Sequence, residues 1–370
     1  MSVDDDLAGG RLTIDLAALV ANWRDLGAAA PTAACAAVIK GDAYGVGLEP
    51  AARALAAAGC RTIFTAQIDE GVRAQRVVPE ATVLVLNGFP PGGAGPVADQ
   101  GLVPVLGCLE EVEEWAALGR ARGRPLPATL HVDTGMNRLG LTPEVAAAVA
   151  ARPDLLADLH LVLLMSHLAC ADVPAHPLNA RQCADFAAVR ALFPGVPASL
   201  ANSAATLALP SAHFDLVRPG IALYGGVAVH GRANPMRPVA RLDGRILMIR
   251  EADAGSPVGY GAAWTLTRPS RLAVVGIGYA DGFPRAAGAY DGRPGASGAI
   301  AGRRVPLVGR VSMDLLVYDV TDLPEVARGD WIELFGPTVP VDEVAHHAGT
   351  IGYEVLTQLG RRFARRYVGG

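Results

Sequence analysis

Eight short apolar runs, separated mostly by helical patterns, limit what this chain can fold into. The runs cover residues 34–39, 62–66, 82–86, 103–106, 129–132, 159–165, 198–200 and 214–217. Helical patterns lie between most of them, for example at 48–58, 109–121 and 180–192. This alternation indicates parallel strands. Eight such strands close naturally into a (β/α)8 barrel, although an open doubly wound sheet would show the same alternation.

The pattern changes after residue 226. Gly, Pro and Arg punctuate residues 231–238, and apolar runs of β character follow. These runs cover residues 245–249, 272–277, 304–308, 315–320 and 331–335. Turn-forming pairs such as Asp291-Gly292 separate them. We therefore expect a barrel over residues 9–233 and a smaller, mainly β domain over residues 234–370.

Charge and composition exclude several classes of protein. The 370 residues carry 32 Lys and Arg against 36 Asp and Glu, and this net charge of -4 does not favour binding to nucleic acid. Every apolar run ends well before the roughly 18 residues that a membrane helix needs. The N-terminus shows no apolar leader, and its Asp4-Asp5-Asp6 run predicts a solvated end. The five cysteines form no CxxC pair, so we expect a cytoplasmic protein with reduced thiols.

A lysine closes the first predicted strand. Lys40 follows Val38-Ile39, and catalytic groups of barrel enzymes lie where strands end. A single lysine at a strand end usually extends its ammonium into water, because burial of that charge is costly. The functional alternative is an amine in a dry pocket, with a lowered pKa, that forms a Schiff base.

Polar residues also end four of the later strands. His131 and Asp133 share one face of the fifth, His167 follows the sixth, Ser203 the seventh and Arg218 the eighth. Each is ordinary alone, since a serine before a helix is usually only a cap. The seventh and eighth loops are the usual phosphate site of a barrel, and Gly220 lets backbone N–H groups approach an anion. A phosphate site together with a buried lysine suggests pyridoxal phosphate.

Several segments resemble the motifs of alanine racemases, in the order found in that family. They are residues 38–45 (VIKGDAYG), 131–140, 201–205, 218–221, 259–261, 278–282, 310–314 and 353–354. The resemblance covers nearly the whole chain. It implies an N-terminal barrel, a C-terminal β domain and a head-to-tail homodimer. In that dimer the C-terminal domain of one copy completes the active site of the other.

The resemblance implies a role for each matching residue. Lys40 would be the Schiff-base lysine and one catalytic base, and Tyr260 of the other subunit the second base. Arg218 would face the pyridine nitrogen of the cofactor, with His167 between Arg218 and Tyr260. The implied phosphate ligands are Tyr44, Ser203, Gly220, Ile221 and Tyr353.

Further residues would serve the substrate. Arg138 would hold the cofactor ring oxygen and contact the substrate, whose carboxylate the Met313 backbone would bind. Tyr279 and Tyr353 would narrow the access channel. His131, Arg310 and Asp314 would lie at the entrance of the site or just behind the residues that bind cofactor and substrate. His131 departs from the family, which commonly has a lysine there that is often carbamylated and orients the arginine. We expect a neutral His131, or an anion or water in the missing role.

The resemblance implies an isomerase that interconverts L- and D-alanine by a two-base mechanism on a pyridoxal-phosphate aldimine. Its product would be D-alanine for cell-wall peptidoglycan. Two bases on opposite faces of a planar carbanion are the simpler arrangement for inverting a centre. A serine or broader-specificity racemase remains open, because pocket width depends on few residues. A non-catalytic pyridoxal-phosphate carrier would need only the barrel. His346-His347 lacks partners at metal-ligand spacing, so we expect no metal.

Overall fold

The computed structural model describes residues 7–370, so the predicted solvated run at residues 4–6 lies outside the described part. The chain divides into two compact units. One unit, which we call the barrel unit, holds residues 19–223 and 228–235. The other, which we call the β unit, holds residues 7–18, residues 224–227 and residues 236–370.

The barrel unit contains all eight predicted strands. Seven pair in parallel in chain order: β3 (Ala37–Val38), β4 (Thr62–Thr65), β5 (Thr82–Val85), β6 (Val103–Leu106), β7 (Leu126–His131), β8 (Leu159–Met165) and β9 (Ala198–Ser199). The eighth, β10 (Leu216–Val217), pairs in parallel with β2 (Ala34–Cys35), which leads directly into β3.

Hydrogen bonds on both sides of β10 close this ring. On its other side, the Asp215 N–H donates to the Ala198 carbonyl at 3.0 Å and the Arg218 N–H donates to the Ala201 carbonyl at 2.9 Å. The predicted (β/α)8 barrel is therefore confirmed, and the alternative of an open doubly wound sheet is wrong. Closure leaves the ring without a free strand edge.

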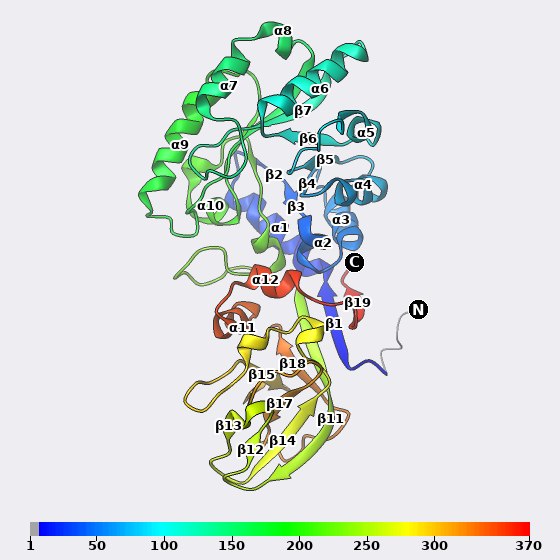
Figure 1. The fold of residues 1–370 in the computed structure, drawn as a ribbon, viewed down its shortest axis with the longest axis vertical. Coiled ribbons are helices and arrows are strands. Elements are labelled where there is room, and N and C mark those ends of the chain that lie inside the picture. The colour runs from blue at the N-terminus through cyan, green and yellow to red at the C-terminus, as the bar shows by residue number, and fades with distance from the viewer. Residues whose placement is uncertain (1–6) are drawn as a thin grey trace. The chain divides into compact units, whose positions relative to one another are not determined.

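Burial of the strands on both faces explains their composition. β6 is buried at every position, and β4 and β5 at all but the first, because side chains fill the barrel inside and helices cover it outside. Figure 1 shows α3 to α6 following one another along the outside of β4 to β7. The helices are α1 (Leu16–Ala29), α2 (Lys40–Tyr44), α3 (Leu48–Ala57), α4 (Ile68–Val77), α5 (Ala94–Asp99), α6 (Leu109–Ala121), α7 (Pro143–Ala150), α8 (Pro153–Leu156), α9 (Pro177–Arg190) and α10 (Ser203–Ala208).

The β unit is built on one branched sheet. Its main order is β16 (Arg303–Pro306), β15 (Ser297–Ile300), β18 (Trp331–Phe335), β11 (Ala240–Ala252), β1 (Gly10–Asp15) and β19 (Ala364–Val368). β11 also pairs with β14 (Ser270–Val275), which pairs with β17 (Leu316–Asp319), while β12 (Pro257–Val258) and β13 (Trp264–Thr265) form a separate pair. Two helices follow, α11 (Val341–Ala348) and α12 (Gly352–Thr357). The β runs predicted after residue 226 are all present.

Strand β1 belongs to this sheet although it precedes the barrel in the sequence. It pairs antiparallel with β11 and parallel with β19, and it buries Leu12 and Ile14 completely. Its alternating burial is typical of a strand with one covered face. The β19 strand ends the sheet, and nearby Arg362 contacts Asp281 at 3.0 Å and Asp314 at 2.9 Å.

Candidate active site

The predicted site residues of the barrel unit lie at one end of the strand ring. Lys40 follows β3 and His131 ends β7. His167, Ser203 and Arg218 follow β8, β9 and β10 within a few residues. Because the strands are parallel, their carboxyl ends meet at the same end of the barrel. The structure therefore brings these five side chains to a shared end of one unit.

Burial and neighbouring charges make the Lys40 amine less basic. Its pKa is lowered first by burial and then by the positive charges of Arg138 and Arg218, while the Glu70 carboxylate acts in the opposite direction. A lowered pKa increases the fraction of neutral amine, which is the form that attacks an aldehyde. This environment favours the functional interpretation of Lys40 over a solvated strand-end lysine.

Composition gives a further signal for this residue. Lys40 is the only lysine in the chain, and the other 31 of its 32 basic residues are arginines. An ammonium group can lose its proton and form a Schiff base, whereas a guanidinium stays protonated. The one position that keeps an amine is thus the one where amine chemistry is predicted. This count was readable from the sequence and adds to the argument from the strand end.

A left-handed turn begins directly after Lys40. Gly41, Asp42, Ala43 and Tyr44 all have positive φ, at 64°, 53°, 55° and 53°. For residues other than glycine this conformation costs roughly 1–2 kcal/mol each. The sequence pattern predicted no such turn, because only Gly41 among the four favours it. The turn ends at Tyr44, four residues after the lysine, and the Tyr44 side chain is buried.

Arg218 is buried and makes three polar contacts. Its guanidinium donates to the Ser199 hydroxyl, to the Ser166 carbonyl at 2.7 Å and to Nδ1 of His167 at 3.4 Å. Burial lowers the pKa of Arg218 to about 9, so it remains a cation at neutral pH. Because arginine can only donate, Nδ1 of His167 must accept.

Both histidines at this end of the barrel are neutral. Burial and the charges of Arg218 and Arg138 lower the pKa of His167 well below its usual value. The same causes lower the pKa of His131 to about 4, with Asp133 acting in the opposite direction. Since Nδ1 of His167 accepts a bond, its proton lies on Nε2. The low pKa of His131 agrees with the neutral imidazole expected from the sequence.

Hydrogen-bond donors surround the Ser203 hydroxyl. Its oxygen accepts the Gly220 N–H at 2.8 Å and the Ala222 N–H at 3.2 Å, on either side of Ile221. A methyl group added at Gly220 would overlap the Tyr44 hydroxyl, so glycine is required for this close approach. Several N–H and O–H groups are thus gathered in a buried place, which suits an anion such as a phosphate.

Asp133 holds the loop that carries Arg138, a role that its place on the face of a predicted strand does not indicate. The Asp133 carboxylate accepts three backbone N–H groups, from Gly135 at 2.9 Å, Met136 at 2.8 Å and Asn137 at 2.9 Å. These bonds fix the loop that leads from β7 to Arg138. An aspartate followed by glycine and asparagine is the local signal for such a turn. Asp133 thus shapes the loop that carries Arg138, and it is also one of the charges that act on His131.

The remaining predicted residues belong to the β unit. Tyr260 begins the short 3-10 turn η3 (Tyr260–Ala262), between glycines with positive φ, and is 73% exposed. Arg310 lies against this turn, since a methyl group at Gly261 would come within 3.4 Å of its Nη1. Arg310 also stacks over the Tyr290 ring, 5.6 Å from the ring centre.

The other four are also partly exposed. Met313 is 53% exposed, and its carbonyl accepts the Ala280 N–H at 2.9 Å, which ties it to the η4 turn (Tyr279–Asp281). Tyr279 and Tyr353, the latter on α12, are exposed large side chains. Asp314 pairs with Arg362. The structure therefore places the predicted residues in two sets, one in each unit.

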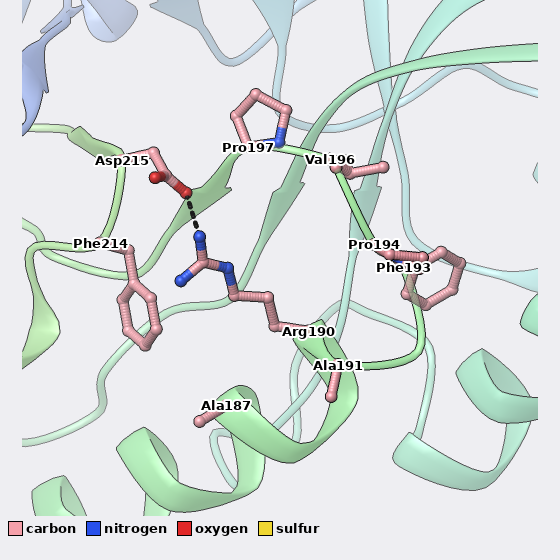
Figure 2. Close-up of a pocket in the computed structure, with 10 residues that line it drawn as sticks. Ala187, Arg190, Ala191, Phe193, Pro194, Val196, Pro197, Phe214 and Asp215 are labelled. Carbon is pink, nitrogen blue, oxygen red and sulfur yellow. Dashed lines mark hydrogen bonds and ion pairs between the residues drawn. The ribbon is translucent and has the colours of Figure 1, made fainter.

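A separate hollow with a volume of about 520 Å³ lies in the barrel unit. Figure 2 shows the residues that line it. Its walls include Phe193, Phe214 and Pro197, and its ion pair joins Arg190 to Asp215 at 2.8 Å. These residues precede β9 and β10, so the hollow lies at the amino-terminal ends of the strands. That end is opposite to Lys40, and none of the predicted site residues lines this hollow.

Comparison with known proteins decides the family. The model of the alanine racemase N-terminal domain matches residues 14–228, and that of the alanine racemase C-terminal domain matches residues 239–367. The chain belongs to the alanine racemase family. The resemblance seen in its motifs is thereby confirmed.

Individual alanine racemases resemble the chain along nearly its full length. One from Methylobacterium sp. (strain 4-46) is 54% identical, covering 97% of this chain and 98% of the relative. A biosynthetic alanine racemase of Agrobacterium fabrum is 49% identical, covering 97% and 93%. The crystal structure of alanine racemase from Bartonella henselae with covalently bound pyridoxal phosphate is 39% identical, with a TM-score of 0.91 and coverage of 98% and 100%.

Residues 7–370 show neither a metal-binding cluster nor a membrane helix. No group of three or more His, Cys, Asp or Glu side chains there lies in a position to hold a metal ion. Within the same residues, none of the helices combines the length and the apolar character that a membrane crossing requires.

Proposed function

We propose that this chain is a pyridoxal-phosphate-dependent isomerase that interconverts L- and D-alanine and supplies D-alanine for peptidoglycan. The observation that carries the proposal is the single lysine of the chain, held with a lowered pKa at the carboxyl end of a barrel strand. Family membership supports the alanine substrate. The 49% identity with a relative named a biosynthetic alanine racemase supports the proposed role in supplying D-alanine.

The residues at the barrel end fit the cofactor. Lys40 would bind its aldehyde, and the buried donors around Ser203, with a glycine where a methyl would collide with Tyr44, suit its phosphate. Arg218 would face the pyridine nitrogen, and Arg138 would hold the ring oxygen. The full set of proposed phosphate ligands is Tyr44, Ser203, Gly220, Ile221 and Tyr353. When bound, pyridoxal phosphate supplies the electron sink for the pair left when Cα loses its proton.

The residues of the chain then move the proton. Lys40 would act on one face of the substrate carbon and Tyr260 on the other, because inversion needs removal and delivery from opposite sides. The Nε2 proton of neutral His167 is available to hydrogen-bond a phenolate oxygen, since Nδ1 already accepts from Arg218. Arg218 cannot hand its own proton to the ring nitrogen, which limits charge withdrawal and favours a short-lived carbanion.

The exposed residues of the β unit support a homodimer with shared active sites. Tyr260, Tyr279 and Met313 are large side chains left at the surface of one copy, and such sets mark contact surfaces. We infer that residues 234–370, the predicted second domain, bring Tyr260 and the Met313 backbone to the barrel of the partner. Tyr279, Arg310 and Asp314 would shape access to that site. The five free thiols support a cytoplasmic location.

Incubation in heavy water tests the reaction. The purified protein is given L-alanine and, separately, L-serine, and chiral chromatography is combined with deuterium uptake at Cα. We expect exchange and inversion to proceed together with alanine. A serine or broader racemase would show comparable inversion of serine, and a carrier would show neither. Exchange on both substrates without inversion would contradict the two-base proposal.

A further inference from the structure

The left-handed turn after Lys40 needs an external hold. Three consecutive residues other than glycine, Asp42, Ala43 and Tyr44, lie in a conformation that is disfavoured for each of them. Such a segment persists only where its surroundings over-determine it. The turn also sets the position of the Lys40 amine relative to the Tyr44 hydroxyl. Whatever holds the turn therefore holds both groups.

Glu70 provides this hold from the neighbouring helix. It is the third residue of α4 and belongs to a capping box with Gln67. Its Oε1 accepts the Asp42 N–H at 3.1 Å, while Oε2 accepts the Ala66 N–H at 3.0 Å and the Gln67 N–H at 3.3 Å. Only 8% of Glu70 is exposed, so these bonds are shielded from water. Figure 1 shows α2, α3 and α4 as neighbours.

A second contact steadies the other side of Asp42. The Asp42 carboxylate accepts the Leu48 N–H at 3.1 Å and a bond from Arg73 Nη2 at 2.9 Å. Arg73 also pairs with Glu49 at 2.7 Å. The Asp42 side chain is thus anchored at the surface, whereas its backbone N–H depends on Glu70.

We propose that Glu70 is a positioning residue for Lys40 and Tyr44, acting by holding the backbone of the turn that joins them. The inference rests on the proposed function, in which Lys40 and Tyr44 bind opposite ends of one cofactor. Glu70 also presents a negative charge to the Lys40 amine, opposing the effects of burial and of the two arginines. It touches neither cofactor nor substrate in this role.

Glu111 offers a matched control within the same barrel. It is the third residue of α6, and its carboxylate likewise ties the loop before its own helix to a neighbouring loop, here the loop that follows β5. It accepts the Gly107 N–H at 2.6 Å and the Phe89 N–H at 3.4 Å. It is not among the charges that shift Lys40. A change at Glu111 therefore removes a carboxylate from an equivalent link between loops without affecting the turn at Lys40.

Replacement of Glu70 by glutamine removes one acceptor and the charge while keeping the shape. An amide has a single acceptor oxygen, and the pair of N–H groups at Ala66 and Gln67 retains it. The NH₂ group then faces the Asp42 N–H, leaving that donor unsatisfied. The turn keeps the contacts of the Asp42 side chain but loses the bond from the Asp42 N–H, and the Lys40 cation loses the carboxylate that raises its pKa.

The experiment compares holoenzymes of the wild type, E70Q and E111Q. We expect E70Q to lose cofactor about tenfold faster on dialysis, because an unsatisfied buried donor weakens the arrangement. The absorbance band of the Lys40–cofactor linkage should titrate at a lower pH, since removal of an anion disfavours the protonated form. E111Q should match the wild type in both measurements. Borohydride reduction and mass spectrometry locate the linkage at the single lysine in every sample.

A second change tests the turn itself. Ala43→Gly allows the left-handed conformation at lower cost. Combined with E70Q it should recover most of the lost cofactor retention, but not the shifted titration, because the charge is still missing. If E70Q fails to fold, Glu70→Asp takes its place, with faster cofactor loss and a titration closer to that of the wild type.

Two results would overturn the proposal. One is cofactor loss and titration in E70Q equal to those of the wild type. The other is equal defects in E70Q and E111Q with no recovery by Ala43→Gly. Failure of the proposed function looks different, because wild-type protein would then carry no borohydride-reducible cofactor on Lys40 at all.

Discussion

The barrel end and the β-unit surface contain the two halves of the predicted site, and they differ in burial and in charge. At the barrel end, the positive charge of Arg218 lowers the pKa values of both Lys40 and His131. On the β unit, Tyr260 and Met313 point mostly into solvent. The charges that shift pKa values in the predicted site thus belong to one unit. The other unit offers side chains that need a covering surface before they can act in a dry site.

Removal of the Tyr260 hydroxyl should reduce activity more than a change at Gly220 or His131. Tyr260→Phe deletes the proposed second base, and loss of a positioned base typically costs about 10²–10⁴-fold in rate. The cofactor should stay bound, because the barrel end is intact. Racemisation in each direction, measured by chiral chromatography, gives the result. Full activity in both directions would show that the exposed tyrosine has no part in the chemistry.

A methyl group at Gly220 should damage the barrel end alone. Gly220→Ala would place its methyl against the Tyr44 hydroxyl, so we expect cofactor affinity to fall by about tenfold to a hundredfold. Gly95→Ala is the matched control, since a methyl there meets nothing within 4 Å. Equilibrium titration with pyridoxal phosphate measures both. Equal affinity in the two variants would show that Gly220 does not border the phosphate site.

The effect expected at His131 is smaller at neutral pH and appears on acidification. The folded chain holds its pKa at about 4 against an ordinary value of 6.5, so below 6.5 the unfolded chain takes up the proton first. Above pH 6.5 the imidazole is neutral in both states, and the free energy of unfolding has its full value. As the pH falls from 6.5 toward 4, proton uptake by the unfolded chain lowers the free energy of unfolding by up to about 3 kcal/mol.

Replacement by asparagine tests this sign. His131→Asn should flatten the decline between pH 6.5 and 4, measured by denaturant unfolding at one fixed protein concentration. His160→Gln, at an exposed position on β8, should leave the wild-type slope unchanged. A parallel decline in wild type and His131→Asn would mean that the imidazole is not held neutral.

Local sequence pattern predicted the fold well where the evidence lay within each segment. Apolar runs that end in a polar residue located the strands and put Lys40, His131 and Arg218 at their ends. Family motifs then supplied the candidate residues of the β unit, which no strand-end argument reaches. Tyr260, for example, lies on a short 3-10 turn with no apolar run before it.

Long-range pairing and backbone conformation escaped prediction. The β1 strand pairs with partners more than 200 residues away in sequence, and nothing within residues 10–15 states which sheet it joins. The left-handed turn at 42–44 uses three residues that ordinarily avoid it, held by Glu70 from another helix. Both features depend on contacts between segments that no single window of sequence contains.

A mixture of two inactive variants decides whether the two halves of the site come from different copies. Lys40→Ala and Tyr260→Phe are purified separately, allowed to exchange subunits and assayed for racemisation. If the site is shared, each mixed dimer holds one intact site, and random exchange restores about a quarter of wild-type activity. If the mixture stays as inactive as its components although mass spectrometry shows mixed dimers, both residues act within one chain and the shared site is refuted.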